Sequence, residues 1–456
     1  MSIPGPSGEC SCGHTDSRCE ENKLTTSTPT RSTNSKEKFI HKGCHPLRQE
    51  LLQMNEKSKK EEQLCESDDN YDMLRIPDHL LHYLFSKLSS KCLAKCKTVS
   101  KDFKRIVEDP EFVKYRKQNG LMEPRILVVP ENPNESMARA YHPADDKWFD
   151  GPPLPGYTKG EVHEAFACVS VGSCLFILGG SRRPANLPSE SGRICGDVWK
   201  YDATTNSWSK MQEMNPPRRL FAASRIGTKI YVAGGQTSAA ILKTAQVYDT
   251  VENKWEDIPD LGCQRLGCRQ LPSVTLNEEL WIIGGRFEQH NTESDGSEFE
   301  TDFAEVYNPV TKNWRLVYQS HRRPYQAQQD PDHDDLSRDM QVEGPLVVAG
   351  GKLLCLQNKK VWQYDQVTTK WTPVGDGPGG AGHDSGFVSV GNQIYVIGGR
   401  PHRPALQTLD TVEVGEIREL QTLSGVDKRQ TDLSWRKASP MGFNHGKILG
   451  VDVVLV

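Results

Sequence analysis

The sequence predicts a mostly β protein, in which a six-bladed β-propeller follows a small all-α domain and a disordered amino-terminal tail. A Tyr and a Trp seven residues apart recur five times, and an apolar run ending in two glycines recurs four times. Helical spacing of apolar residues, in contrast, is confined to one segment near residues 71–120. Sequence repeats of this kind are typical of folds that stack copies of one structural unit.

The spacing between the aromatic residues defines the repeat. The five pairs are Tyr141–Trp148, Tyr201–Trp208, Tyr248–Trp255, Tyr307–Trp314 and Tyr364–Trp371. Each pair encloses polar residues that favour turns. The four apolar runs end at Gly179-Gly180, Gly234-Gly235, Gly284-Gly285 and Gly398-Gly399.

Composition and charge restrict the class of function. The chain has 456 residues, a formal net charge of −4 and only 36% hydrophobic residues. This balance provides no basic field for nucleic acid, and no apolar run approaches the ~20 residues of a membrane span. Because the amino terminus lacks the features of a secretory signal, we expect a protein of the cytoplasm, the nucleus or both, with its 13 cysteines reduced.

Residues 1–70 are rich in polar and charged residues and nearly free of aromatics. Such a segment buries too little apolar surface to offset the entropy lost on ordering, so we expect a disordered tail. It contains a group of metal-binding residue types, namely Cys10, Cys12, His14, Cys19, His41, Cys44 and His45. Their spacing matches no familiar zinc finger, which favours a solvated tail over a metal site.

Residues 71–120 have the spacing of short helices. Pro77 suits the first turn of a helix, and Leu80, Leu81, Leu84, Phe85 and Leu88 follow on one face. Further short helices are predicted around Leu93 and Phe103 and after Asp109-Pro110, and Gly120 suits a helix end.

This segment resembles an F-box. Ile76-Pro77, the leucine-rich helix, Val99-Ser100-Lys101, Phe103 and Pro110-Glu111-Phe112 carry the resemblance, although Ile76 replaces the usual Leu and Phe103 the common Trp. The resemblance implies binding to a Skp-type adaptor and, through it, to a cullin. The residues it implicates are Ile76, Pro77, Leu80, Leu81, Leu84, Phe85, Leu88, Leu93, Val99 and Phe103. The alternative is a helical cap that only packs on the next domain.

Residues 121–456 divide into four-stranded units. In one unit the strands are expected near Ala165–Val171, Leu175–Leu178, Val198–Tyr201 and from Trp208. The diglycine and the Tyr–Trp pair make these units similar to kelch repeats, which implies a β-propeller. We expect six blades, with the strand after His445 completing the first one.

Two units depart from the pattern. In the fifth, Gly350-Gly351 is expected in the turn between the first two strands. In the sixth, Val414 is expected where Tyr would stand, with a long insertion before Trp435.

Motifs that suggest chemistry have simpler explanations here. Gly377–Gly382 matches G-x-G-x-x-G, but the dinucleotide motif requires a strand before it and a helix after it, and an apolar β-like segment follows instead. No Ser/His/Asp or metal-ligand constellation stands out. We therefore expect no cofactor, no metal and no catalytic residues.

Strand order places all long, variable connections on one face of the propeller, where recognition usually occurs. Basic residues gather in them, and the candidate substrate-binding set is Arg182, Arg183, Arg218, Arg219, Arg286, Arg400, His402 and Arg403, extended by Arg193, Arg265 and Arg269. Arginines there could bind carboxylates or phosphates. Alternatively, they pair within their own repeats.

An F-box followed by kelch repeats resembles a substrate receptor of a ubiquitin ligase, an arrangement abundant in plants. The alternatives are a kelch scaffold without a ligase role and an enzyme built on the propeller. No feature of the sequence favours the enzyme.

Overall fold

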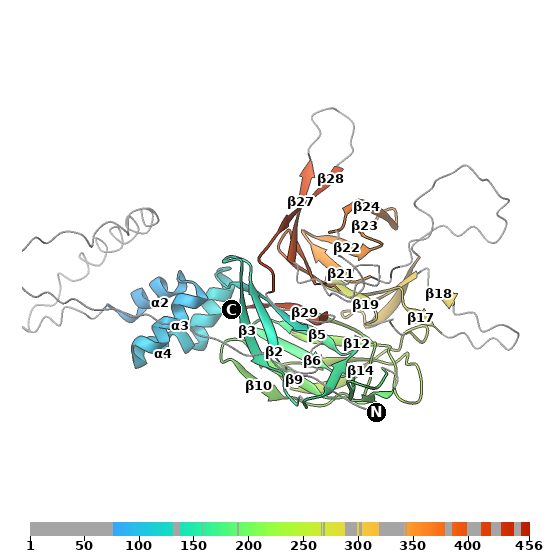
Figure 1. Ribbon diagram of the computed structural model, residues 1–456, viewed down its shortest axis with the longest axis horizontal. Coiled ribbons are helices and arrows are strands. Elements are labelled where there is room, and N and C mark those ends of the chain that lie inside the picture. Colours follow the sequence, from blue (N-terminus) through green and yellow to red (C-terminus); the bar gives the residue numbers. More distant parts are fainter. Residues whose placement is uncertain are drawn as a thin grey trace, which may run out of the picture. The chain divides into compact units, whose positions relative to one another are not determined.

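The computed structural model separates into two units, Met1–Ile76 and Pro77–Val456, and the second contains the helices and the sheets (Figure 1). The structure describes residues 76–130, 137–156, 158–188, 191–265, 267, 270–287, 299–300, 303–318, 342, 344–378, 385–398, 412–420, 430–441 and 448–456. The tail predicted over residues 1–70, with its Cys and His residues, lies outside this part. Within the described residues, no helix combines the length and the apolar character needed to span a bilayer.

Four short helices form the amino-terminal part of the second unit: α2 (Asp78–Ser86), α3 (Ser90–Val99), α4 (Lys101–Glu108) and α5 (Pro110–Gln118). Three begin at side-chain caps. The Ser89 hydroxyl accepts from Cys92 N, the Ser100 hydroxyl from Phe103 N and the Asp109 carboxylate from Glu111 N. Each cap satisfies a main-chain N–H that the helix leaves unpaired, so these polar residues set where the helices start.

The helices enclose a small core of Phe85, Leu93, Ile106, Val107 and Phe112. These side chains come from all four helices, so one core joins the whole group. The Phe103 ring packs edge-on against Phe85 at 4.9 Å between centroids. We call this part the helical domain.

Among the described residues, six sheets have four strands each. They are formed, from the inner strand outward, by β29 (Ile448–Leu455), β1 (Pro124–Pro130), β2 (Met137–His142) and β3 (Lys147–Pro153); β5 (Ala167–Val171), β6 (Cys174–Leu178), β9 (Val198–Asp202) and β10 (Ser207–Lys210); β11 (Ala222–Ile226), β12 (Lys229–Ala233), β13 (Ala245–Asp249) and β14 (Lys254–Ile258). The other three are β15 (Ser273–Leu276), β16 (Glu279–Ile283), β19 (Phe303–Asn308) and β20 (Asn313–Tyr318); β21 (Leu346–Ala349), β22 (Lys352–Gln357), β23 (Lys360–Asp365) and β24 (Lys370–Asp376); and β25 (Gly386–Val390), β26 (Gln393–Ile397), β27 (Val412–Leu420) and β28 (Gln430–Lys437).

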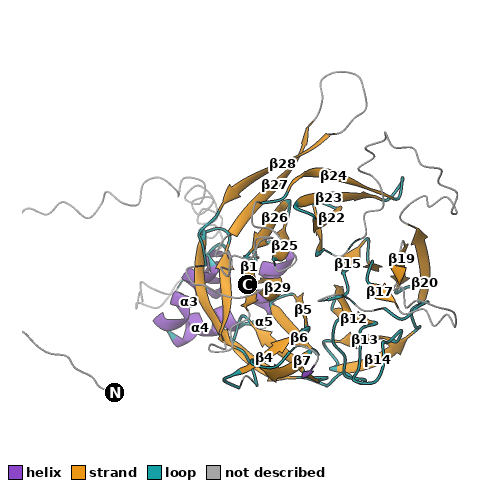
Figure 2. Ribbon diagram, turned by 45° about the vertical axis from the view of Figure 1, so that its right-hand side comes forward, coloured by secondary structure: helices purple, strands orange, loops and turns teal. Residues whose placement is uncertain are grey.

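The inner strands contact one another in the cyclic order β5, β11, β15, β21, β25, β29 and back to β5. The sheets therefore surround a common axis (Figure 2). The strand β29, from the carboxyl end of the chain, pairs with β1 in the first sheet, antiparallel from Pro124↔Leu455 to Pro130↔Ile448. The predicted mostly β class with a propeller-like repeat is confirmed, and we call residues 121–456 the ring.

Each Tyr–Trp pair forms a cross-strand contact. Tyr and Trp face each other across the two outer strands in all five pairs, with ring centroids 4.9–5.3 Å apart. The fifth residue after each Tyr has a left-handed φ of 49–57°. Where this residue is Asp146, Asn206 or Asn253, its side chain accepts a hydrogen bond from the Tyr hydroxyl. Asn and Asp tolerate this conformation best, which explains the polar sequence between Tyr and Trp.

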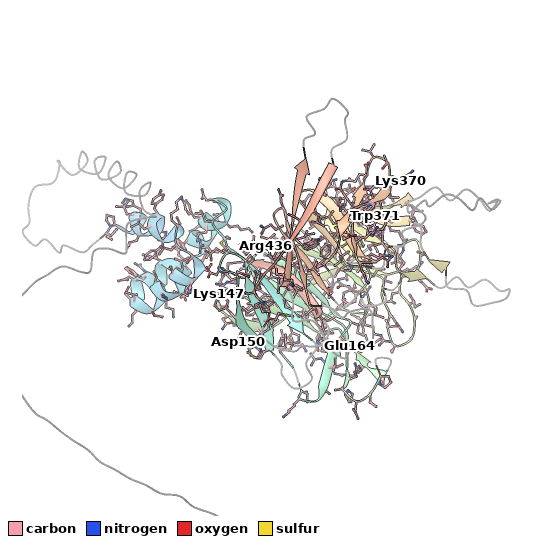
Figure 3. The ribbon with its side chains drawn as sticks, turned by 45° about the horizontal axis from the view of Figure 1, so that its top comes forward. Lys147, Asp150, Glu164, Lys370, Trp371 and Arg436 are labelled. Carbon is pink, nitrogen blue, oxygen red and sulfur yellow. The ribbon has the colours of Figure 1, made fainter. Side chains whose placement is uncertain are left out.

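The tryptophans also join neighbouring sheets. The indole N–H groups of Trp148, Trp255, Trp314 and Trp435 donate to main-chain oxygens of the preceding sheet or of the loop that follows it, at 2.6–3.0 Å. The repeated aromatic residues are thus used in packing within and between the sheets. Trp371 follows Lys370, the first residue of β24 (Figure 3).

The two irregular repeats differ in how well they were predicted. Gly350-Gly351 does form the turn between β21 and β22. In the sixth sheet, however, Gly415 stands opposite Trp435 and Ile394, the register that Tyr occupies in the other sheets. The assignment of this position to Val414 is wrong by one residue. A Cβ on Gly415 would lie 3.0 Å from the Trp435 ring, so the indole takes the space left by the missing Tyr.

Candidate functional sites

The apolar residues of the helical domain divide into a core and an exposed face. Phe85 and Leu93 are buried, and Leu81, Leu88 and Phe103 pack against the core. Val99 and Ile76, in contrast, leave 69% and 47% of their surface exposed. Pro77 is exposed, and Leu80 and Leu84 are partly buried outside the core cluster.

This division separates two roles within the ten residues that the F-box resemblance implicated. Core residues hold the helices together, whereas an exposed apolar residue gains stabilisation only when another surface covers it. Within the helical domain, Pro77, Leu80, Leu84 and Val99 are therefore the described residues of this set best placed to contact a partner, and we call these four the apolar face. Ile76, the last residue of the first unit, is exposed as well.

The ring has two unequal ends. At one end, short turns join the first strand to the second in the second to sixth sheets, and the third strand to the fourth in the first to fifth sheets; we call this the turn face. At the other end, the loop face, connections vary in length and include a small sheet of β4 (Glu161–Glu164), β7 (Ser181–Pro184) and β8 (Arg193–Ile194), and the strand pair β17 (Arg286–Phe287) and β18 (Phe299–Glu300).

Arg218 lies on the loop-face connection before β11 but is fully buried. Its guanidinium donates to the main-chain oxygens of Gly234 and Thr244 at 3.1 and 2.9 Å. Its own main-chain oxygen accepts from Gly180 N of the preceding sheet, and a Cβ on Gly179 would lie only 2.6 Å from that oxygen. Arg218 thus joins two sheets, and its assignment to a substrate-binding surface is wrong because no part of it reaches solvent.

Arg265 occupies the equivalent place in the next repeat. Its side chain donates to Gly284 O at 3.0 Å and pairs with Glu305 at 3.0 Å, with 0% and 1% of the two side chains exposed. Its main-chain oxygen accepts from Gly235 N. The diglycines at Gly179-Gly180 and Gly234-Gly235 therefore allow close approach of an arginine backbone, and the arginine side chain then anchors its own sheet.

Burial shifts the pKa of Arg218 more than the nearby carboxylates do. Burial lowers the pKa of Arg218 to about 10, although the carboxylates of Asp257 and Asp260 act in the opposite direction. The guanidinium remains protonated at neutral pH. It is held by carbonyl groups inside the ring and is not offered to an anionic ligand.

Arg182 and Arg183 lie on β7 of the small sheet and are mostly covered. Arg183 Nε donates to Glu164 at 2.9 Å, and its Nη1 donates to Leu187 O at 2.7 Å (Glu164 is labelled in Figure 3). Arg182 is 3.5 Å from Asp197 and also donates to Gly156 O. Both residues therefore fit the alternative interpretation, in which the arginines pair within their own repeats.

The remaining basic candidates have different positions. Arg219 is partly buried at the channel lining, and Arg193 is exposed on β8. The side chain of Arg286 and all of Arg269, Arg400, His402 and Arg403 lie outside what the structure describes. Among the described residues, the basic set therefore does not form one continuous surface.

At the small sheet, the partly buried His163 contacts the buried Cys195, a contact that the sequence did not predict. His163 Nε2 lies 2.8 Å from Gly179 O and 3.7 Å from Cys195 Sγ. Burial, aided by the Arg182 charge, lowers the pKa of His163 to about 4. Burial also raises the pKa of the Cys195 thiol, so this contact pairs a neutral imidazole with a thiol and provides no activated nucleophile.

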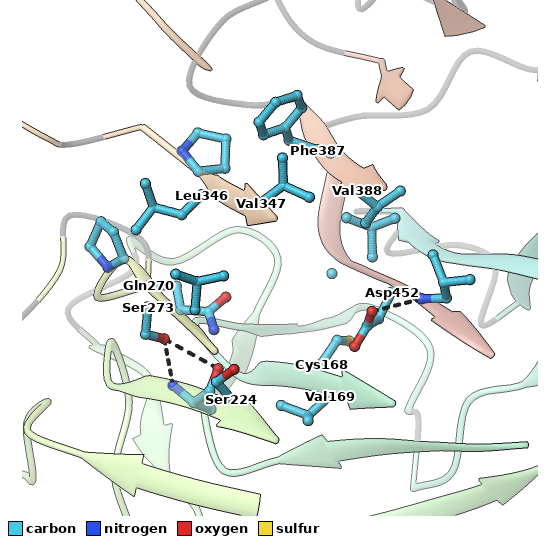
Figure 4. Close-up of a pocket in the computed structure, with 18 of the residues that line it drawn as sticks. Cys168, Val169, Ser224, Gln270, Ser273, Leu346, Val347, Phe387, Val388 and Asp452 are labelled. Atoms are coloured by element: carbon cyan, nitrogen blue, oxygen red, sulfur yellow. Dashed lines mark hydrogen bonds between the residues drawn. The ribbon is translucent and has the colours of Figure 1, made fainter. Parts of the chain in front are cut away.

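A central channel of about 1050 Å³ runs between the inner strands (Figure 4). Its polar groups mostly join neighbouring strands. Ser273 Oγ bonds the main chain of Ala223, Ser389 Oγ donates to Val348 O, and Asp452 accepts from Ser170 N at 2.6 Å. These bonds connect inner strands of different sheets. The polar groups that form them therefore stabilise the ring and are not free to bind a ligand.

The described residues contain no group of three or more His, Cys, Asp or Glu placed to hold a metal ion. The described part of Gly377–Gly382 follows strand β24, and a strand, β25, comes next in the chain. The helix that a dinucleotide site requires is not among the described elements there.

Comparison with known proteins supports the two-part organisation. Residues 73–115 match the family model described as F-box domain, and residues 139–330 match the one described as KLHDC2/KLHL20/DRC7 Kelch-repeats domain. An F-box/kelch-repeat protein of Arabidopsis thaliana is 25% identical over 385 residues, which cover 80% of this chain and 92% of the relative. F-box/kelch-repeat protein SKIP11 of the same plant is 24% identical, covering 75% of this chain and 71% of its own.

A solved structure titled "Structure of YjhT" is similar to 67% of this chain and 98% of its own, with 14% identity and a TM-score of 0.47.

Proposed function

The chain belongs to the F-box/kelch-repeat proteins, and we propose that it is the substrate-recognition subunit of a Skp–cullin–F-box type ubiquitin ligase. In this role the helical domain binds a Skp-type adaptor, the adaptor binds a cullin, and the ring binds a target protein. The chain itself is not an enzyme. Its place of action is the cytoplasm, the nucleus or both.

The observation that carries the proposal is the apolar face of the helical domain. Val99 remains exposed although the domain buries a core of its own, and Ile76, which precedes the domain in the chain, is exposed as well. Covering a Val or Ile side chain stabilises a complex by about 1.5–3 kcal/mol. A partner with a complementary apolar surface, such as a Skp-type adaptor, would provide that cover.

The ring supports the proposed binding of a target protein, because it is a scaffold that holds the loop face. Within the basic set, Arg182, Arg183 and Arg219 remain candidates for target contact, together with Arg286, Arg400, His402 and Arg403. The buried Arg218 does not. Target recognition by these loops follows the general rule that recognition loops are held by a rigid framework.

The mechanism requires no covalent chemistry by this chain. Holding a target and a ubiquitin-charged enzyme on one assembly turns an encounter between separate molecules into one with a high effective concentration. Correct orientation of a target lysine contributes further to the rate.

The test is capture of a Skp-type adaptor and a cullin by the full chain, compared with a Leu80→Asp, Leu84→Asp variant. Both leucines are partly buried outside the core cluster, so the charges fall on the apolar face. Wild type should capture both proteins, and the variant should lose capture because a charge cannot be covered by an apolar surface without a large desolvation cost. The variant's propeller should unfold at the wild-type temperature.

A kelch scaffold without a ligase role is the alternative. A folded wild-type chain that captures neither protein would favour it. Retained capture by the Leu80→Asp, Leu84→Asp variant would likewise contradict the apolar face as the binding surface.

A further inference from the structure

A short connection, held in place by hydrogen bonds, joins the helical domain to the ring. Only residues 119–123 lie between α5 and β1. Leu121 N donates to Arg116 O at 2.9 Å, and Arg116 Nη2 returns a bond to Leu121 O at 2.7 Å. The connection is therefore folded back on α5 and does not behave as a free linker.

Glu123 ends this connection and extends the first sheet by one residue pair. Its main-chain N–H donates to Val456 O, and Val456 N donates to Glu123 O, both at 2.9 Å. The pair continues the register of β1 with β29, in which Pro124 faces Leu455. Leu455 N also donates to Gly172 O, in the first turn of the second sheet. Glu123 is thus fixed where the ring closes.

The first residue of α3 meets this point from the helical domain. Ser90 is 6% exposed, its N–H donates to the Glu123 carboxylate at 2.9 Å, and its hydroxyl donates to Val456 O at 3.0 Å. A carboxylate at the amino end of a helix satisfies an unpaired N–H and interacts favourably with the helix dipole. Glu123 therefore caps α3, and Val456 O binds the side chain of the first residue of that helix.

Further charges surround the Glu123 carboxylate. His142 Nε2, on β2, lies 3.4 Å from it, and His142 Nδ1 lies 3.1 Å from Asp145. Burial alone would raise the pKa of Glu123, but the Ser90 hydrogen bonds and the charges of His142 and Arg116 keep it below its usual value. The carboxylate is ionised at neutral pH, so its bond to Ser90 is charge-assisted.

We propose that Glu123 is a positioning residue, which fixes the helical domain to the turn face of the ring by capping α3. The site lies at the end of β29 and the start of β1, on the face opposite the variable loops. A partner on the helical domain and a target on the loop face are then held at a set distance by one rigid body. This consequence rests on the proposed ligase function, whereas the junction itself does not.

The sharpest variant is Ser90→Pro in the full chain. Ser90 is the first residue of α3, where proline is tolerated, and Ser89 before it has the extended conformation that proline requires. Proline removes both junction donors and keeps the Ser89 cap. Lys101→Pro is the matched control, because Lys101 is the first residue of α4, is exposed and follows an extended Ser100.

The measurement is single-molecule energy transfer between fluorophores on non-natural amino acids that replace Cys92 on α3 and Val367 on the fifth sheet, both exposed. Wild type and Lys101→Pro should each give one narrow population. Ser90→Pro should lose it and give a broad distribution with an unchanged melting temperature of the ring. Glu123→Ala should act in the same way, and it serves if Ser90→Pro fails to fold.

A single narrow population in a folded Ser90→Pro or Glu123→Ala chain would overturn the proposal, as would a broad distribution in wild type. Both variants should still capture the adaptor, and loss of capture by a folded variant would contradict a positioning role. A wild-type chain that shows one population but captures no adaptor would refute the ligase function and leave the junction intact.

Discussion

On the helical domain, Val99 exposes 69% of its surface, whereas in the ring Arg218 and Arg265 expose none of theirs. The small domain thus leaves apolar groups in solvent, and the large one buries charged groups. A buried guanidinium is stable only when carbonyl and carboxylate groups surround it, as Gly234, Thr244 and Glu305 do here.

The difference reflects how each region is held together. The helical domain is small, and apolar surface left outside its core is available to a partner. In the ring, the inner strands of adjacent sheets share no ladder, so polar side chains must connect them. Residue type alone is therefore a poor guide to function, because an exposed valine is a better candidate contact here than a buried arginine.

Arg265→Ala should give the largest effect on stability. It leaves the Glu305 carboxylate buried without its partner, and breaking such a pair costs about 3–5 kcal/mol. Unfolding in guanidinium chloride, followed by tryptophan fluorescence, measures the loss of unfolding free energy. Arg193→Ala, at an exposed arginine, is the control and should change the free energy of unfolding by less than about 0.5 kcal/mol. Equal losses of unfolding free energy in the two variants would contradict the claim that the buried arginine stabilises the ring.

His163 should make the ring less stable in mild acid. Its pKa falls from 6.5 to about 4 on folding, so between these values the unfolded chain binds a proton that the native chain does not. Stability from this group is complete above pH 6.5 and is lost as the pH falls, by about 3 kcal/mol near pH 4. The free energy of unfolding of His163→Gln, measured against pH, should have a shallower slope over this range. Identical slopes would contradict burial of a neutral imidazole.

Arg116→Ala sharpens the comparison, because Arg116 is a buried charge within the helical domain and is 5% exposed. Its loss frees the Leu121 and Leu88 oxygens, but the nearby Glu123 carboxylate keeps its hydrogen bond from Ser90 N. We expect a loss of about 2 kcal/mol, smaller than that of Arg265→Ala. Circular dichroism of the helices during unfolding measures it. The exposed Arg105→Ala is the control, and a larger loss than that of Arg265→Ala would mean that domain context matters more than burial of an ion pair.

Local signals were predictable from the sequence. The Tyr–Trp spacing identified the outer turns because one residue with a left-handed φ completes each of them. The apolar spacing identified the helices because their core draws on residues of every helix. Both signals lie within one element or one turn.

Long-range contacts were not predictable. The burial of Arg218 depends on Gly180 of the preceding sheet, and no local pattern links the two. The only available signal was a diglycine in each preceding repeat, which indicates close approach of another backbone without identifying it. Gly415 was misplaced for a similar reason, because its register is set by pairing with Ile394 across a connection of variable length.

The central claim is that the exposed apolar residues of the helical domain bind a partner. Isothermal titration of a purified Skp-type adaptor into wild type, Val99→Asp and Val251→Asp tests it most directly. Val251 is 78% exposed on the ring and is the matched control for Val99. We predict that Val99→Asp weakens adaptor binding about tenfold or more and that Val251→Asp has no effect. Equal affinity of all three proteins, or no binding by wild type, would contradict the account.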